Sequence, residues 1–286
     1  MRIVIINGEV TPPETAAISV YDRGFLYGDS VFETIRTYGA RPFALGEHLA
    51  RLERSAKRVF IPLTVSRATL AAELEQGLAL CQNDESFVRV MLTRGTGPLG
   101  LDPDLAEKPN RVVLVEPFVP PPAEAYEQGI EAIVVHAARA ADATPAAGAK
   151  VANYLTSLLA IREARRRGAV EAIIVDARGS VLEGTTSNVF LVKDGELVTP
   201  PETAGILAGI TRAYVLRAAA DVGVKTALRD VRESELFAAD ELFISSTLRE
   251  VLPVVRLEGR AIATGRPGLI TGRLHGAFRK YVAGVG

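Results

Sequence analysis

Short runs of β-branched residues alternate with amphipathic stretches along the chain, and this alternation predicts a mixed α/β (α+β) protein. Apolar residues that recur every three or four positions predict helices, whereas Val- and Ile-rich runs closed by turn residues predict strands. We expect helices at residues 46–60, 68–80, 152–167, 211–220 and 269–281. We expect strands at residues 3–6, 31–38, 87–93, 111–118, 130–136, 172–175, 189–192 and 241–245. The Asn7-Gly8 pair after the first strand predicts a tight hairpin.

A proline-rich segment near the middle of the chain predicts a domain boundary. Pro120, Pro121 and Pro122 are consecutive, and such a run fits neither a helix interior nor a central strand. It is typical of a stiff, extended linker. We therefore expect a small N-terminal α/β domain at residues 1–118, a linker at 119–124 and a larger C-terminal domain at 125–286.

The charge balance argues against a polyanionic partner. The chain has 286 residues, of which 48% are hydrophobic, and its 33 basic and 34 acidic residues leave a formal net charge of −1. Such a chain has no general attraction for nucleic acid or an anionic membrane, and no apolar stretch approaches the length of a membrane helix. A small molecule bound in a local site is the expected partner.

Cysteine and histidine usage narrows the chemistry further. Cys81 is the single cysteine, so no intrachain disulfide forms, and this suits a reducing cytoplasm. The N-terminal apolar run is too short for a signal peptide. His48, His136 and His275 are far apart and follow no metal-ligand spacing, so we expect no metal site.

Lys150 has an unusual setting among the six lysines of the chain. It leads directly into an apolar segment that is predicted to be helical, where a cation is mildly unfavourable. On position alone, a solvated lysine at a helix start is the favoured interpretation. Glu183, before a Gly-Thr-Thr-Ser turn, is a loop residue or the partner of a buried base. Residues 208–212 open a helix whose free N–H groups favour an anion, and residues 245–247 bring hydroxyls to a strand tip.

Six motifs occur in one order along the chain, and together they resemble the class IV aminotransferases. They lie at residues 21–36, 47–52, 150–155, 183–188, 209–212 and 245–247. The family includes branched-chain aminotransferases, D-amino-acid aminotransferases and 4-amino-4-deoxychorismate lyases. The resemblance implies the two-domain fold type IV (D-amino-acid aminotransferase-like), with pyridoxal 5'-phosphate (PLP) in the C-terminal domain. It also implies a homodimer.

The resemblance assigns cofactor roles to individual residues. Lys150 is the catalytic residue, which holds the cofactor as a Schiff base and moves a proton. Arg51 pairs with the phosphate, as a planar bidentate donor should. The remaining cofactor-binding residues carried over are Tyr154 (phenolic oxygen), Glu183 (pyridine nitrogen), Leu207 (ring packing), and Ile210, Thr211 and Thr247 (phosphate).

The substrate side matches no single branch of the family. Branched-chain enzymes typically have glycine where this chain has Thr34, and tyrosine where it has Phe87. The best-known D-amino-acid enzymes carry Arg and His after Thr-Arg-Gly-Thr, where this chain has Leu99 and Leu101. The Phe-Glu-Thr motif is shared with the lyases.

These features favour a transaminase that acts on an amino acid, either a branched-chain or hydrophobic L-amino acid or a D-amino acid. The acceptor is a 2-keto acid such as 2-oxoglutarate or pyruvate. The lyase reaction, which forms 4-aminobenzoate for the folate pathway, remains the alternative. The expected substrate-binding residues are Tyr27, Phe32, Arg36, Phe87, Arg89 and Leu248.

Overall fold

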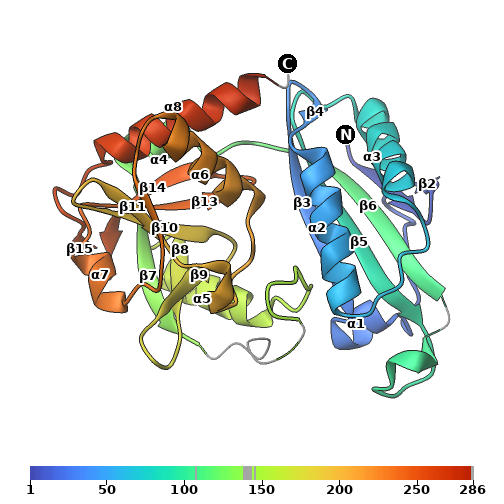
Figure 1. The fold of residues 1–286 in the computed structure, drawn as a ribbon. Helices are drawn as coiled ribbons and strands as arrows, with labels where there is room; N and C mark the ends of the chain where they lie inside the picture. The colour runs from blue at the N-terminus through green and yellow to red at the C-terminus, as the bar shows by residue number, and fades with distance from the viewer. Residues whose placement is uncertain (107, 138–143, 145, 285–286) are drawn as a thin grey trace. The chain divides into compact units, whose positions relative to one another are not determined.

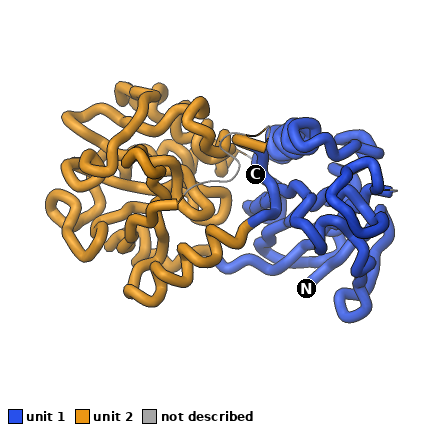
Figure 2. The backbone as a smooth tube through the Cα atoms, turned by 90° about the horizontal axis from the view of Figure 1, so that it is seen from below, with its two compact units in different colours: residues 1–119, 149–153, 285–286 blue, residues 120–148, 154–284 orange. Residues whose placement is uncertain are grey.

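The computed structural model describes residues 1–106, 108–137, 144 and 146–284, which divide into two compact units (Figure 2). Unit 1 comprises Met1–Val119 and Ala149–Asn153, and unit 2 comprises Pro120–Gly148 and Tyr154–Gly284. The chain first crosses from unit 1 to unit 2 between Val119 and Pro120. The segment that carries Lys150 belongs to unit 1, although the expected boundaries place it in the C-terminal domain.

Unit 1 is a six-stranded sheet covered on one face by two helices (Figure 1). The strand order is β2-β1-β6-β5-β3-β4. The strands are β1 (Ile3–Ile6), β2 (Glu9–Thr11), β3 (Ser30–Tyr38), β4 (Arg41–Pro42), β5 (Ser86–Thr96) and β6 (Lys108–Pro117). The helices are α1 (Arg23–Tyr27), α2 (Leu45–Arg58) and α3 (Arg67–Cys81), with a 3-10 turn at Pro103–Leu105.

The core of unit 1 forms where α2 and α3 meet the sheet. Leu52 and Leu74 are fully buried there against Ile35 and Val88. Side chains alternate between the two faces of a strand, so the same register turns the neighbouring residues of β3 to the other face. This alternation decides which residues of β3 and β5 are available to a ligand.

Unit 2 is built on a nine-stranded sheet with the order β12-β11-β10-β13-β14-β7-β8-β9, and β15 pairs with β14. Its strands are β7 (Ile130–His136), β8 (Glu171–Val175), β9 (Val181–Gly184), β10 (Asn188–Lys193), β11 (Glu196–Thr199), β12 (Thr226–Leu228), β13 (Glu241–Ser246), β14 (Glu250–Leu257) and β15 (Arg260–Ala261). Its helices are α4 (Ala123–Gln128), α5 (Leu155–Arg166), α6 (Ile210–Asp221), α7 (Glu233–Phe237) and α8 (Leu269–Ala283), with a 3-10 turn at Glu202–Ala204.

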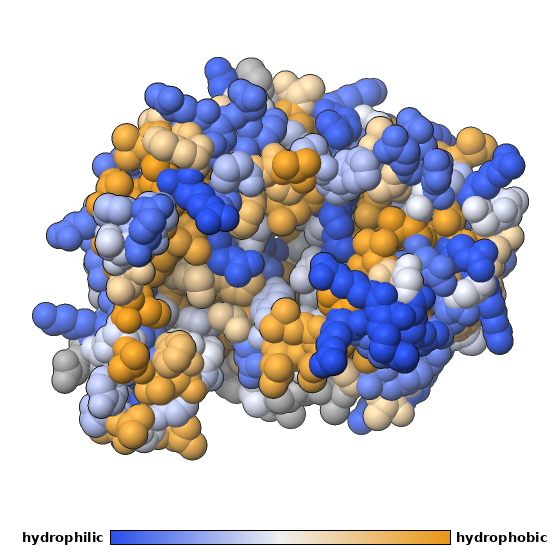
Figure 3. All heavy atoms as spheres, turned by 180° about the vertical axis from the view of Figure 1, so that it is seen from behind, coloured by the Kyte–Doolittle hydropathy of each residue, from blue (hydrophilic) through white to orange (hydrophobic). Residues whose placement is uncertain are grey.

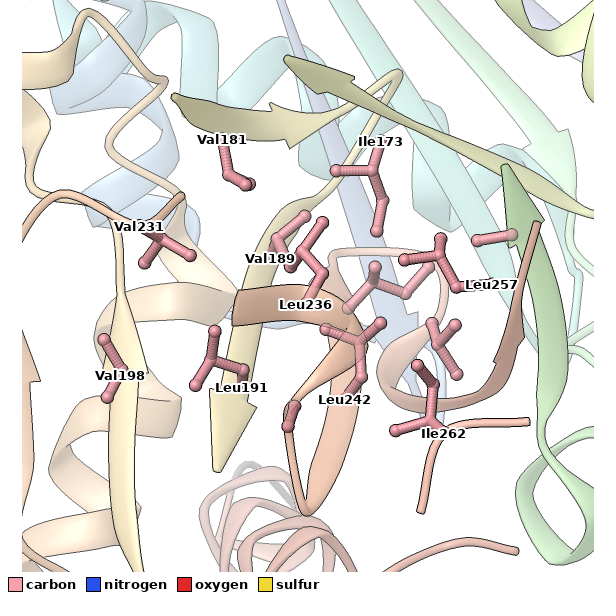
Figure 4. Packing of buried hydrophobic residues seen from close by; sticks show 14 of the residues in the cluster. Ile173, Val181, Val189, Leu191, Val198, Val231, Leu236, Leu242, Leu257 and Ile262 are labelled. Carbon is pink, nitrogen blue, oxygen red and sulfur yellow. The ribbon is translucent and has the colours of Figure 1, made fainter. Parts of the chain in front are cut away.

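The core of unit 2 lies between these strands and the short helix α7. Figure 4 shows Val189 and Leu191 of β10 and Leu242 of β13 beside Leu236 of α7 and Ile262. All five side chains are buried.

None of the helices in the described ranges combines the length and the hydropathy needed to cross a bilayer.

The expected mixture of helices and strands is confirmed, with a few corrections. The hairpin at Asn7-Gly8 forms, and Ile6 pairs with Glu9 across it. Helix α5 begins at Leu155 and not at residue 152, because Val151 forms a β-bridge with Val31. Helix α4 begins inside the expected linker. The elements that the sequence pattern does not predict are mostly short: α1, α4, α7, β2, β4, β9, β11, β12, β14 and β15.

Candidate active site

Lys150 is anchored by its backbone to the sheet and helix of unit 1. Its carbonyl accepts a hydrogen bond from Phe32 N at 3.0 Å, and its own N–H donates to the buried Ser55 Oγ of α2 at 3.1 Å. Two residues later, Ala152 N donates to Ser30 O at 2.9 Å. The lysine therefore lies in an extended segment along β3, not at a helix start. This segment directs the amine over the Phe32 ring, 4.7 Å from the centroid.

A buried cluster of charge surrounds Arg51 in the same unit. The Arg51 guanidinium donates to both Glu33 carboxylate oxygens, each at 2.7 Å, and His48 Nδ1 lies 2.8 Å from Glu33 Oε2. Burial opposes the charged form of Glu33, but Arg51 and His48 outweigh it and lower the pKa of this carboxyl to about 2. Burial also lowers the pKa of His48. The cluster holds the guanidinium of Arg51 in one orientation.

The opposite face of β3 collects four of the predicted substrate residues. In β3, Phe32 and Arg36 lie two residues before and two residues after Thr34. Thr34 pairs with Arg89 of β5, and Arg36 pairs with Phe87. Directly paired residues project on the same face of a sheet. The Arg89 guanidinium carbon lies 4.6 Å from the Phe32 ring centroid. One aromatic ring therefore contacts both this cation and the Lys150 amine.

Tyr27 and Arg36 have other neighbours in unit 1. Tyr27 ends α1, and its hydroxyl accepts a hydrogen bond from Gly100 N at 3.1 Å. Arg36 is 3% exposed, and its guanidinium lies 4.3 Å from the Tyr38 ring centroid and 4.7 Å from that of Phe118. Stacking of this kind orients an arginine without neutralising its charge.

In unit 2, Glu183 is fixed by two donors from different segments. Its Oε2 accepts from Leu207 N at 3.0 Å and from Asn188 Nδ2 at 3.3 Å. Asn188 Nδ2 also donates to Leu207 O at 2.9 Å. Glu183 at the end of β9 and Leu207 before α6 therefore lie together, as the resemblance implies. Asn188, to which the sequence assigns no role, links them.

At the start of α6, the backbone of Gly209 lies close to the side chain of Asn188. A Cβ on Gly209 would lie 2.0 Å from Asn188 Oδ1, so any larger residue at this helix N-cap requires Asn188 to move. Ala213 is the first residue whose N–H bonds back, to Gly209 O at 3.0 Å. The N–H groups of Ile210 and Thr211 therefore precede the intrahelical hydrogen bonds and are oriented as anion donors.

The predicted Thr247 and Leu248 occupy the turn between β13 and β14. Arg249 N closes this turn by donating to Ser246 O at 3.2 Å. Next to the turn, Ser245 Oγ is buried and has no hydrogen-bond partner among the described residues. Tyr154 is the half-buried N-cap residue of α5.

The motif resemblance assigns no role to several paired polar residues. They are Glu33 and His48 in unit 1, and Asn188, Glu171 and Arg249 in unit 2. Glu171 begins β8, whose other residues are all apolar, and this is the one local signal for a buried, paired carboxylate.

Comparisons with known proteins agree on the family. The family model described as amino-transferase class IV matches residues 30–257. The branched-chain-amino-acid aminotransferase of Escherichia coli strain K12 is 36% identical over 278 residues, which cover 95% of this chain and 90% of that protein. The D-alanine aminotransferase of Bacillus licheniformis is 33% identical over 279 residues, which cover 98% and 96%.

Solved structures agree with the sequence comparisons. The T.th. branched-chain amino acid aminotransferase with pyridoxamine 5'-phosphate has a TM-score of 0.93 and 31% identity, covering 99% of this chain and 95% of that chain. The Escherichia coli branched-chain amino acid aminotransferase has a TM-score of 0.91 and 34% identity, covering 97% and 93%.

Class IV aminotransferases use PLP, and the residues of this chain fit it. PLP presents an aldehyde, a phosphate and a pyridine nitrogen. The chain offers an amine at Lys150, a fixed guanidinium at Arg51, a fixed carboxylate at Glu183 and the N–H groups at the start of α6. The unsatisfied Ser245 hydroxyl is a further buried polar group that a bound ligand would satisfy. The chain belongs to the class IV aminotransferases and is a PLP-dependent transaminase.

Proposed function

We propose that this transaminase takes the amino group of a hydrophobic amino acid, including the branched-chain L-amino acids, and passes it to a 2-keto acid such as 2-oxoglutarate or pyruvate. The observation that carries the proposal is the shared Phe32 ring. It lies 4.7 Å from the Lys150 amine and 4.6 Å from the Arg89 guanidinium, so a reactive amine and a carboxylate-binding cation flank one apolar surface.

Arg89 is the proposed carboxylate ligand. Its Nε is buried and has no hydrogen-bond partner in the described part of the chain, and a buried polar group of this kind is costly unless something binds it. A substrate carboxylate is a geometrically suitable acceptor for a planar guanidinium. We propose Arg36, Tyr27, Phe87 and Leu248 as the residues that shape the rest of the substrate site.

The fixed polar groups described above support the proposed cofactor roles. We propose that Lys150 holds PLP, that Glu183 faces the pyridine nitrogen and that Tyr154 donates to the phenolic oxygen. Leu207 packs on the ring, and the phosphate ligands are Arg51, Ile210, Thr211 and Thr247. The bound cofactor supplies an electron sink for the electron pair left when the donor's Cα–H bond breaks. Lys150 removes this proton and returns it to complete the transfer of the amino group.

We also propose a homodimer in the cytoplasm. Leu155, Leu158 and Leu159 of α5 are 64%, 63% and 56% exposed, and their spacing places them on one face of the helix. An exposed apolar stripe of this kind supports a protein–protein interface. Figure 3 shows that hydrophobic residues also reach the surface in patches between hydrophilic residues. The lone free cysteine, Cys81, suits a reducing compartment.

A half-reaction screen tests the proposal. L- and D-amino acids are added singly to the holoenzyme, without acceptor, and the loss of the cofactor absorbance near the visible edge is followed. Branched-chain L-amino acids should bleach the band, and the K150A variant should show no bleaching with any of them. A response to D-amino acids alone would overturn the proposed substrate class. Pyruvate release from aminodeoxychorismate without an acceptor would favour the lyase.

A further inference from the structure

A fully buried carboxylate in unit 2 joins the loop after β9 to the strand β8. Glu171 Oε1 accepts from the N–H of Thr185 at 3.1 Å and from the Thr185 hydroxyl, and Glu171 Oε2 accepts from Ser187 Oγ at 2.9 Å. The loop also lies tight against this carboxylate, because a Cβ on Gly184 would be 3.2 Å from its carboxyl carbon. Glu171 thus fixes both ends of the loop at residues 184–187.

Arg249 links the same carboxylate to the turn between β13 and β14. One of its terminal nitrogens lies 2.6 Å from Glu171 Oε2 and 2.7 Å from Thr186 Oγ1, and its Nε donates to Ser246 Oγ at 3.3 Å. Its backbone N–H closes the turn on Ser246 O. Burial opposes ionisation of Glu171, but Arg249 and the hydrogen bonds hold the pKa of this carboxyl below its usual value.

The two segments joined in this way carry residues of the proposed cofactor and substrate sites. The loop at 184–187 separates Glu183 from Asn188, which hydrogen-bonds Glu183. The turn at 246–249 carries Thr247 and Leu248. Glu171 itself is 0% exposed, so it acts on a ligand only through these two segments.

We propose that Glu171 and Arg249 are positioning residues, which set the affinity for PLP by holding the Thr247 turn and the Glu183 loop in one fixed arrangement. This inference rests on the proposed roles of Thr247 and Glu183. Removal of either partner frees the turn to move, and a polar ligand displaced by a fraction of an ångström loses much of its hydrogen-bond energy.

The test compares PLP dissociation constants, measured by titrating apoenzyme with PLP, with the melting temperatures of the same apoenzymes. We expect E171Q and R249M each to weaken PLP binding about tenfold or more, since a hydrogen bond to a charged group contributes about that factor. T186V removes one exposed hydroxyl that accepts from Arg249 and leaves the buried carboxylate intact. It should weaken binding by a smaller factor, and it remains informative if E171Q folds poorly.

E241Q is the matched control in the same unit. Glu241, at the other end of β13, accepts from the N–H groups of Ile270 and Thr271 at the start of α8, at 3.0 and 2.7 Å. Its loss should lower the melting temperature and leave PLP affinity unchanged. If E171Q and R249M behave like E241Q, their role is structural and the inference is wrong.

T247A separates this inference from the function it rests on. If T247A weakens PLP binding while E171Q, R249M and T186V do not, the positioning role is overturned and the cofactor site stands. If T247A leaves PLP binding unchanged, the proposed role of Thr247 fails. In the double variant E171Q/R249M the two losses should not add, because both residues act through one network.

Discussion

The Arg51 guanidinium donates hydrogen bonds to both oxygens of the Glu33 carboxylate, each at 2.7 Å, and neither side chain is more than 5% exposed. A buried ion pair of this geometry pairs the two charges and fixes the plane of the guanidinium. Arg51 is a proposed phosphate ligand. The pair therefore joins the stability of unit 1 to the orientation of a cofactor-binding side chain.

Replacement of Glu33 by glutamine should destabilise the protein strongly. E33Q leaves the Arg51 charge buried without its counterion, and losing one partner of a buried pair typically costs about 3–5 kcal/mol. We expect the free energy of unfolding, measured with urea, to fall by about this amount. D240N is the control, because its partner Lys193 is 46% exposed and ion pairs between exposed side chains contribute little to stability. Equal losses in the two variants would contradict a special role for the Glu33 pair.

The same pair predicts how stability depends on acid. The pKa of Glu33 is about 2 in the folded protein against the usual 4.5, so the folded state binds this proton less readily than the unfolded state. The resulting stabilisation is complete above pH 4.5 and disappears as the pH falls from 4.5 to 2; a difference of this size is worth on the order of 3 kcal/mol. Urea unfolding across this pH range should show a steeper loss in the wild-type protein than in E33Q. Parallel curves would contradict the assignment.

The R89A variant should separate substrate binding from cofactor binding. Loss of a charged hydrogen-bond partner for a carboxylate costs about 1.5–3 kcal/mol, which corresponds to an increase in KM for the amino donor of roughly 10- to 100-fold. The cofactor absorbance should stay unchanged. R2A removes another arginine of unit 1, which is 71% exposed and pairs with Glu116, and should leave KM unaffected. Unchanged kinetics in R89A would remove Arg89 from the substrate site.

Much of the fold follows from local patterns, but some elements depend on distant partners. The apolar spacing in residues 46–60 and 68–80 predicts α2 and α3 to within two residues, because packing on one face sets their period. The pattern does not predict β14, because Pro253 argues against a strand flanked by two others. It places the start of α5 too early, because the bridge between Val151 and Val31 is a tertiary contact.

The residues of the candidate site also fall into those that a local motif marks and those that depend on a distant partner. Motif resemblance assigns roles to Lys150, Glu183 and Thr247, since each lies in a short recognisable motif. It assigns nothing to Glu171, whose partner Arg249 lies 78 positions along the chain. A single sequence shows such a carboxylate only as a charged residue among the apolar residues of a strand, and it does not identify the residue that pairs with it.

The G209A substitution should weaken PLP binding indirectly, because it displaces Asn188, which hydrogen-bonds the proposed cofactor ligand Glu183. The backbone at this helix N-cap, with φ −66° and ψ 134°, suits any residue, so the effect comes from the added Cβ, 2.0 Å from Asn188 Oδ1. Asn188 must move, and its hydrogen bonds to Glu183 and to the Leu207 carbonyl move with it.

We expect G209A to lose about 1–3 kcal/mol of stability, typical of overpacking, and to bind PLP more weakly in an apoenzyme titration. Gly272 in α8 is the matched control, because a Cβ there meets nothing within 4 Å. In an exposed helix interior, alanine is favoured over glycine by about 1 kcal/mol, so G272A should raise the melting temperature and leave PLP affinity unchanged. If G209A binds PLP as tightly as G272A, Asn188 does not hold the Glu183 carboxylate for the cofactor.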